Sequence, residues 1–338
     1  MKRKDKFYDL LESYFSSYLP IAKGLSDATV TSYKTTFRLL FEFLITRKNV
    51  SAEEIVFSLF TVELIQEFLD WLETDRNNSV KTRNQRLSAL SAFAQYAQCR
   101  DLNNAVVFRA NVSAVPRKKG IQKTRTFFTR DEVKILLDAP DCKNEIGIRD
   151  KTLLTVMYAS GMRAQEVCDM KVGDIQFYSD RAGIRILGKG KKMRRIGIPK
   201  QASKALEKYI VHRKLMDKKE RHVFSSQTHE KMTISCIEEI FRKYLKSCRS
   251  EHPDMFRDSY SPHSMRHTTA THMLEAGVPL VVVKNFLGHA SLQTTQIYAE
   301  VTQDTMNRQL RTWNEKWFLK NDESEEKANK NMIPDFLR

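Results

Sequence analysis

The sequence predicts a mainly α-helical protein with one small antiparallel β-sheet. Along most of the 338 residues, apolar side chains recur at three- and four-residue steps, the periodicity of helices packed on a core. Residues 184–187 and 193–198 differ, because they have the composition of two short strands. Between them, Gly188-Lys-Gly190 predicts a tight hairpin tip, since glycine lets the backbone turn sharply.

Residues 1–115 are predicted to form a helical domain. Ser51-Ala-Glu-Glu54 is a capping box, which predicts a helix start, and another helix is expected from about Ser79. The two apolar stripes before Ser79 consist of Tyr33, Phe37, Leu40, Phe41 and Leu44, and of Val62, Ile65, Leu69 and Leu72.

The helix from Ser79 carries Lys81, Arg83 and Arg86 in its first turns. Cations there oppose the helix dipole, so something other than helix stability favours them. We interpret them as DNA contacts; the alternative is a solvated face.

Residues 116–126 lose all periodicity and are rich in basic side chains, among them Arg117, Lys118 and Lys119. This composition predicts an interdomain linker that crosses a phosphate backbone. The alternative is a simple soluble tether.

A second domain is expected over residues 127–302. Thr129-Arg-Asp-Glu132 is a capping box, and the helical pattern that includes 153–158 ends at Gly161. After the hairpin, helices are expected near residues 200–216, 235–246, 262–275, 279–287 and 292–298.

The composition limits the classes of function. A formal net charge of +16 favours a polyanionic partner, although ribosomal, membrane-surface and heparin-binding proteins share this property. The five cysteines are scattered and include no CxxC pair, which argues against a disulfide framework or zinc cluster and is typical of a reducing cytoplasm. No run approaches the roughly 18 apolar residues that span a bilayer, so a cytoplasmic protein without a membrane partner is expected.

Two segments place polar residues where regular structure breaks. After Gly161, Arg163 should lie near a helix start, with Glu166 three residues on and able to brace it. Lys189 should project from the hairpin tip, and Lys191, Lys192 and Arg194 beside it are predicted DNA contacts. Taken alone, the first pair could be a surface salt bridge and the second segment a solvated turn.

Two further segments carry histidines. Ser261 and Pro262 begin a helix, which places His263 in its first turn and Arg266 on the same face, at the positive helix end that suits a phosphate. The spacing of His263 and His267 also occurs in zinc proteases, but the glutamate of that motif is missing, so no metal site is expected.

The fourth segment follows the apolar helix at 279–287. Gly288 ends that helix and leaves His289 in a turn, and Tyr298 follows about two helical turns later. In isolation, a tyrosine at position 298 would more often be a packed aromatic side chain than a nucleophile.

Together these segments resemble the tyrosine recombinases, also called phage-type integrases. The resemblance is strongest over residues 150–300. The family signature is Arg…Lys…His-x-x-Arg…His/Trp…Tyr. In this sequence it is filled by Arg163, Lys189, His263, Arg266, His289 and Tyr298.

The resemblance implies a role for each signature residue. Arg163 and Arg266 would hold the non-bridging phosphate oxygens, because a guanidinium presents its donors as a fork. Tyr298 would be the nucleophile, with His263 as base and Lys189 as the acid that protonates the leaving 5′ oxygen. His289 would hydrogen-bond the phosphate, Glu166 would orient its neighbours, and no cofactor would be needed.

The resemblance also implies the architecture and the partners. A core-binding domain (1–115) and a catalytic domain (127–302) would form a C-shaped clamp on duplex DNA with paired inverted core sites. Residues 303–338, with an apolar stripe that includes two tryptophans, would dock on a neighbouring protomer in a homotetramer; the alternative is that they pack on their own domain. The chain is most similar to compact Xer-type or transposon-encoded members. Integration, excision, transposition and Xer-type resolution stay open, as does the need for accessory proteins.

Two rival functions remain at this point. A type IB topoisomerase uses related chemistry but acts as a monomer on one strand. A catalytically silent DNA-binding regulator would have a broken signature, whereas all six positions are filled here.

Overall fold

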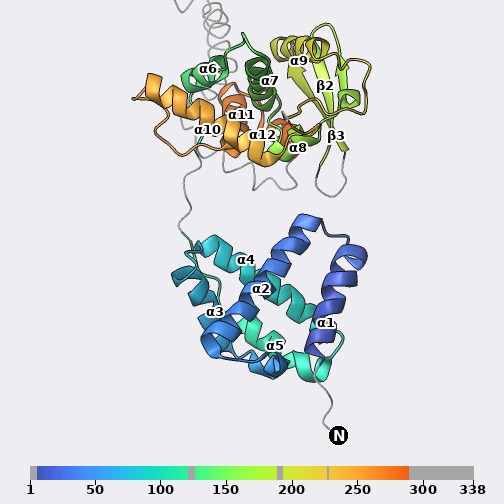
Figure 1. Cartoon of the computed structure of the whole chain (residues 1–338), viewed down its shortest axis with the longest axis vertical. Coiled ribbons are helices and arrows are strands. Elements are labelled where there is room, and N and C mark those ends of the chain that lie inside the picture. The colour runs from blue at the N-terminus through green and yellow to red at the C-terminus, as the bar shows by residue number, and fades with distance from the viewer. Residues whose placement is uncertain (1–5, 121–125, 189–192, 227, 289–338) are drawn as a thin grey trace, which may run out of the picture. The chain divides into compact units, whose positions relative to one another are not determined.

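The computed structural model describes residues 6–120, 126–188, 193–226 and 228–288 (Figure 1). The chain divides into two compact units, Met1–Lys123 and Thr124–Arg338. Among the described residues, the first unit is all helical and the second combines helices with a three-stranded antiparallel sheet. The predicted fold class, mainly α with one small antiparallel sheet, is confirmed.

The first unit is a bundle in which α4 packs against α1, α2, α3 and α5. Its core is aromatic: Phe93 is fully buried, and its ring centroid lies 5.6 Å from that of Phe7 and 5.1 Å from that of Phe37. Edge-on and offset ring pairs of this kind add to the stabilisation from burial. The elements are α1 (Phe7–Ser13), the π-helical η1 (Tyr14–Ala22), α2 (Asp27–Lys48), the 3-10 helices η2 (Ala52–Glu54) and η3 (Phe57–Leu59), α3 (Val62–Thr74), α4 (Val80–Gln98) and α5 (Leu102–Ala114).

The two predicted helix starts in this unit turned out differently. Ser79 caps α4 as expected, because its hydroxyl accepts from the N–H of Thr82. The capping box at Ser51 forms, but the prediction of a full helix there is wrong, since only the 3-10 turn η2 follows. Ile55, Phe57 and Phe60 after it are all buried, and their spacing does not fit one helix face.

The second unit contains the predicted hairpin and one additional strand. Strands β2 and β3 pair with Leu187 opposite Met193, and β1 pairs with the other edge of β2. Helices α7 and α9 pack against this sheet, and α11 packs against α7 (Figure 1). The predicted helix at residues 292–298 lies outside the described residues. The elements are α6 (Arg130–Asp138), α7 (Glu145–Ser160), α8 (Ala164–Asp169), the 3-10 helix η4 (Val172–Asp174), β1 (Ile175–Phe177), β2 (Arg181–Leu187), β3 (Met193–Pro199), α9 (Lys200–His212), α10 (Ile234–Glu251), α11 (Pro262–Glu275) and α12 (Leu280–Leu287).

Helix α11 is buried although it is largely polar. The hydroxyl of Thr268 accepts from the N–H of Phe128 at 2.9 Å, and the hydroxyl of Thr269 donates to the carbonyl of Tyr158 at 2.7 Å. His272 Nε2 lies 3.0 Å from the Phe128 carbonyl. Buried polar groups are tolerated when they are hydrogen-bonded, and these bonds fix α11 against its neighbours.

Candidate active site

The first signature segment follows a glycine that the packing requires. Gly161 ends α7 in the left-handed region, at φ +58°, and an added Cβ there would lie 2.7 Å from Cδ2 of Leu287. Only glycine fits both the conformation and the space. The tight turn places Arg163 at the N-cap of α8.

Arg163 and Glu166 brace one another as predicted. The N–H of Arg163 donates to Oε2 of Glu166 at 2.9 Å, and its Nη1 donates to Oε1 at 3.0 Å. The Glu166 side chain is only 8% exposed, whereas that of Arg163 is 39% exposed. One side of the Arg163 guanidinium is therefore held by the protein, while the side chain stays accessible to solvent.

A second arginine, on β3, holds the same carboxylate. Arg194 donates from Nη1 to Oε1 of Glu166 at 2.9 Å and from Nη2 to Oε2 at 2.7 Å. Burial raises the pKa of Glu166, but the hydrogen bonds from Arg194 and Arg163 outweigh it and hold that pKa below its usual value. The Glu166 carboxylate is thus ionised at neutral pH.

The two described signature residues of α11 differ in exposure. His263 is exposed in the first turn, whereas Arg266 is 1% exposed. Arg266 donates from Nη1 to the carbonyl of Gly161 and from Nη2 to the carbonyl of Leu287, both at 2.6 Å. These carbonyls lie at the C-terminal ends of α7 and α12, where the helix dipoles favour a cation.

The end of α12 joins the same cluster. Gly288 caps α12 in the left-handed region, at φ +66°, and an added Cβ there would lie 2.8 Å from Cδ of Arg194. Contacts therefore link residues from four separate parts of the second unit, namely Arg163, Arg194, Arg266 and Gly288. Lys189, His289 and Tyr298 lie outside the described residues, although Gly288 directly precedes His289.

Two of the predicted DNA contacts make hydrogen bonds inside the protein. Arg83 is 1% exposed, and its Nη1 donates to the carbonyl of Pro116 at 2.8 Å. Arg194 is bound to Glu166, as described above. Both guanidiniums therefore make internal contacts in the structure. Position 83 lies four residues before the buried Leu87, a spacing that indicates the inner face of α4.

The other predicted DNA contacts in the first unit are accessible to different degrees. Lys81, Arg117, Lys118 and Lys119 are exposed, and Lys118 pairs with two carboxylates on α3. Arg86 is half-buried and donates to a carbonyl on α2, and its burial lowers its pKa. Lys191 and Lys192 lie outside the described residues.

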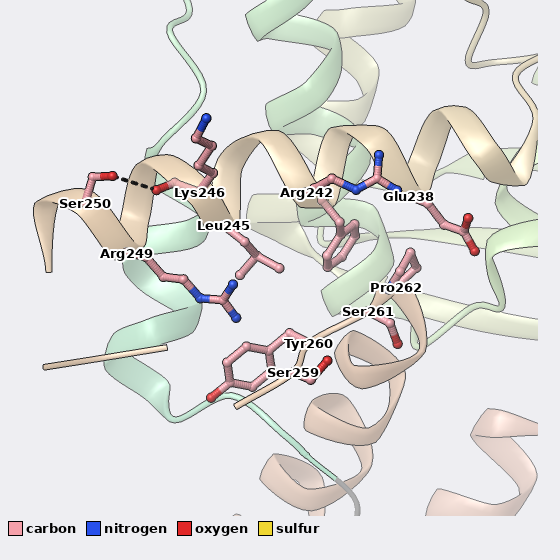
Figure 2. A pocket seen from close by; sticks show the side chains of 11 residues that line it. Glu238, Arg242, Leu245, Lys246, Arg249, Ser250, Ser259, Tyr260, Ser261 and Pro262 are labelled. Atoms are coloured by element: carbon pink, nitrogen blue, oxygen red, sulfur yellow. Dashed lines mark hydrogen bonds between the residues drawn. The ribbon is translucent and has the colours of Figure 1, made fainter. Parts of the chain in front are cut away.

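A basic hollow that the sequence did not indicate lies beside the start of α11. It has a volume of about 610 Å³. Glu238, Arg242 and Lys246 on α10 line one side of it, and Ser261 and Pro262 line the other. In Figure 2 the Lys246 side chain extends on the side of α10 away from Tyr260. Arg249 crosses it and donates to the carbonyls of residues 256 and 258. The sequence does contain one indication of this hollow, because Arg242 and Lys246 are two exposed cations four residues apart on an amphipathic helix.

The described residues include no group of three or more His, Cys, Asp or Glu side chains that could hold a metal ion. The rings of His263 and His267 pack edge to face, with centroids 4.4 Å apart. Within the same residues, no helix is long and apolar enough to cross a membrane.

Comparisons with known proteins cover both units. Residues 126–305 match the model of the phage integrase family, and residues 12–101 match the phage integrase N-terminal SAM-like domain. The chain is 32% identical to the putative integrase/recombinase y4rC of Sinorhizobium fredii, over 87% of each chain. It is 33% identical to the tyrosine recombinase XerC of Chlamydia caviae, over 75% of this chain and 78% of that one.

Solved structures of similar fold come from the same group of proteins. A post-cleavage complex of the XerH site-specific recombinase with its palindromic difH substrate has a TM-score of 0.68 and 19% identity, and the match covers 87% of this chain and 82% of that one. The Tn1549 transposon integrase with a circular-intermediate DNA has a TM-score of 0.66 and 16% identity, over 88% and 98% of the two chains. At these identities the likeness concerns the fold.

The family match covers more than half of the chain, and it includes the segments that gather Arg163, Glu166 and Arg266 into one cluster. This protein belongs to the phage integrase family, the tyrosine recombinases.

Proposed function

We propose that the protein is a site-specific recombinase that cleaves and rejoins duplex DNA through a 3′-phosphotyrosyl intermediate on Tyr298. The observation that carries this proposal is the contact of Arg266 with the ends of both α7 and α12. This contact places Arg163 and Gly288, the residue before His289, in one cluster. Relatives named as tyrosine recombinases, and fold neighbours solved with DNA, support duplex DNA as the substrate.

The chemistry proposed for the cluster is an in-line transfer at phosphorus. The phenol oxygen of Tyr298 attacks the phosphate while the bond to the 5′ oxygen breaks. His263 accepts the phenol proton, and Lys189 donates a proton to the leaving oxygen. Arg163 and Arg266 stabilise the charge that builds on the non-bridging oxygens, because their donors are held in place before reaction. Reversing the steps with a new 5′ hydroxyl rejoins the strand.

The proposed division of labour follows the two units. Residues 1–115 would bind the core site, residues 116–126 would link the domains, and residues 127–302 would carry the chemistry. Residues 303–338 lie outside the described residues, and we propose that they dock on a neighbouring protomer in a tetramer on paired sites. A type IB topoisomerase would act without such pairing, so light scattering of the protein on two-site DNA distinguishes the two functions.

The central test is a covalent adduct on a suicide substrate. A duplex is first selected from a randomised library by binding to the purified protein, and is then nicked at successive positions. When the nick lies next to the scissile phosphate, the short 5′-hydroxyl fragment should diffuse away. A protein–DNA band should then persist in a denaturing gel. A chain that binds the selected duplex but forms no band with any nick would be a regulator rather than a recombinase.

The role of Lys189 predicts a substrate-specific rescue. Lys189→Ala should lower the cleavage rate about 10²- to 10⁴-fold, the range for loss of a general acid. A 5′-bridging sulfur at the scissile position should restore the rate, because a thiolate leaves without a proton. Lys192→Ala, from the same hairpin, is the control and should show no sulfur-specific gain. If Lys189→Ala lowered the cleavage rate by the same factor on the oxygen and sulfur substrates, Lys189 would be excluded as the acid.

The basic wall of the hollow on α10 predicts a contribution to DNA binding. Arg242 and Lys246 are exposed, four residues apart, and next to the helix start that presents His263. Each phosphate contact contributes about −0.9 to the slope of log K against log salt. The Arg242→Ala, Lys246→Ala double variant should therefore reduce the magnitude of that slope by about 2 in fluorescence anisotropy titrations.

The control for this prediction is a matched pair on α9. Lys204 and Lys208 are also exposed and four residues apart. Their double alanine variant loses the same net charge, so a general effect of charge would change both variants alike. An identical slope for the α10 and α9 variants would contradict a DNA contact at the hollow.

A further inference from the structure

The Glu166 carboxylate is shared between two guanidiniums. Its Oε1 accepts from Nη1 of Arg163 at 3.0 Å and from Nη1 of Arg194 at 2.9 Å. Its Oε2 accepts from the N–H of Arg163 at 2.9 Å and from Nη2 of Arg194 at 2.7 Å. Each oxygen thus receives two donors, which fills the acceptor capacity of a buried carboxylate.

The two arginines use the carboxylate in different ways. Arg194 forms the two-nitrogen pair that a guanidinium ordinarily makes with a carboxylate, and its side chain is 14% exposed. The Arg163 side chain makes only a one-nitrogen contact with Glu166 and is 39% exposed. If Arg194 were absent, Glu166 would be a buried anion with Arg163 as its remaining guanidinium. Arg163 would then be drawn into the two-nitrogen pair.

Arg194 also contacts the segment that leads to His289. Its Cδ, Nε and guanidinium carbon lie so close to Gly288 that an added Cβ there would be 2.8, 3.0 and 3.2 Å from them. Arg194 itself lies on β3, directly after the hairpin that carries Lys189. The side chain of Arg194 therefore contacts or borders three of the signature segments.

We propose that Arg194 is a positioning residue for Arg163. By occupying both oxygens of Glu166, it keeps Arg163 in a one-nitrogen contact, so that the rest of the Arg163 guanidinium can bind the phosphate. This inference rests on the proposed function, because it assigns Arg163 to the scissile phosphate. It replaces the DNA contact that the sequence suggested for Arg194.

The test uses Arg194→Met, which keeps the length of the side chain and removes its charge and donors. Single-turnover cleavage of the selected duplex should become about 10- to 100-fold slower, up to the scale of losing one transition-state donor. The slope of log K against log salt should not change, whereas loss of a true phosphate contact would reduce its magnitude by about 1. Arg194→Lys, which restores charge without the fork, should recover part of the rate.

A neutral substrate separates positioning from a general structural effect. With a methylphosphonate at the scissile position, one charged oxygen is replaced by methyl, so the demand on Arg163 falls. Wild type and Arg194→Met should then react at similar rates. In the Glu166→Gln background, Arg194→Met should have little further effect on the phosphate substrate, because the two residues act as a unit. Arg195→Met, on the exposed neighbour in β3, is the control and should leave the cleavage rate unchanged.

The outcomes distinguish this inference from the proposed function. If wild type forms no covalent adduct, the proposed function fails whatever Arg194 does. If wild type cleaves, three results would each overturn the inference: an unchanged rate in Arg194→Met, a reduced salt slope, or an equal loss on the phosphate and methylphosphonate substrates. If Arg194→Met does not fold, Arg194→Lys carries the same comparison between substrates.

Discussion

Tyr298→Phe is expected to form no detectable covalent adduct on the nicked duplex while it still binds that duplex. The substitution removes only the phenolic oxygen, which is the atom proposed to attack phosphorus. DNA affinity should stay within about 2-fold of wild type, since binding depends on many cations and not on one hydroxyl. A denaturing gel of the radiolabelled duplex, with an anisotropy titration of the same protein, measures both quantities.

Another tyrosine of the catalytic unit provides the control for this result. Tyr178 is exposed, and Tyr178→Phe also removes one phenolic oxygen. It should trap the adduct as wild type does. An adduct that persists in Tyr298→Phe would assign the nucleophile to another residue, and peptide mass spectrometry of that adduct would identify it. Loss of both binding and adduct would instead indicate a damaged fold, which the second unit's amide exchange would report.

Local signals predicted the parts of the site that depend on neighbouring residues. Ser261 and Pro262 predicted the start of α11, and the three-residue step predicted that Glu166 braces Arg163. Both are contacts within one turn, where the residue types alone determine the geometry. The Ser51 box satisfied the same rule but produced only a 3-10 turn, because three apolar residues after it are buried in a pattern that no helix face could satisfy.

The features that the sequence did not predict depend on distant partners. Arg83 and Arg194 looked like DNA contacts because they lie among other cations. Their partners are 33 and 28 residues away, at Pro116 and Glu166, so no local pattern could distinguish them from exposed arginines. Strand β1 is too short for an alternating pattern and is defined by its pairing with β2. The residues proposed to act in the reaction could be predicted from their spacing in the sequence. The groups that hold those residues in place could be identified only from the tertiary structure.

The two signature arginines should respond differently to removal, although both serve the phosphate in our proposal. Arg163→Ala and Arg266→Ala should each lower the single-turnover cleavage rate at least about 10²-fold, the scale of losing a preorganised donor. Arg163 is partly exposed, and Glu166 keeps its two-nitrogen pair with Arg194 when Arg163 is removed. The fold should therefore tolerate Arg163→Ala.

Arg266→Ala should loosen the fold as well as slow the chemistry. Arg266 is buried, and its two hydrogen bonds hold the carbonyls of Gly161 and Leu287 at the ends of two helices. Loss of two charge-assisted hydrogen bonds, with buried acceptors left behind, costs on the order of 2–4 kcal/mol. Amides of α7, α11 and α12 should then exchange with deuterium faster, by about 10- to 10³-fold.

Hydrogen exchange followed by mass spectrometry makes this comparison without assuming that the two units unfold together. Peptides from α4, in the other unit, provide the internal reference and should exchange at the wild-type rate in both variants. Arg266→Lys keeps the charge but lacks the fork that reaches two carbonyls, so its exchange rates should lie between those of wild type and alanine. Equal protection of α11 in Arg163→Ala and Arg266→Ala would contradict a structural role for Arg266. In that case the buried hydrogen bonds from Arg266 to the two helix ends would contribute little to the stability of the site. Arg266 would then act only in the reaction.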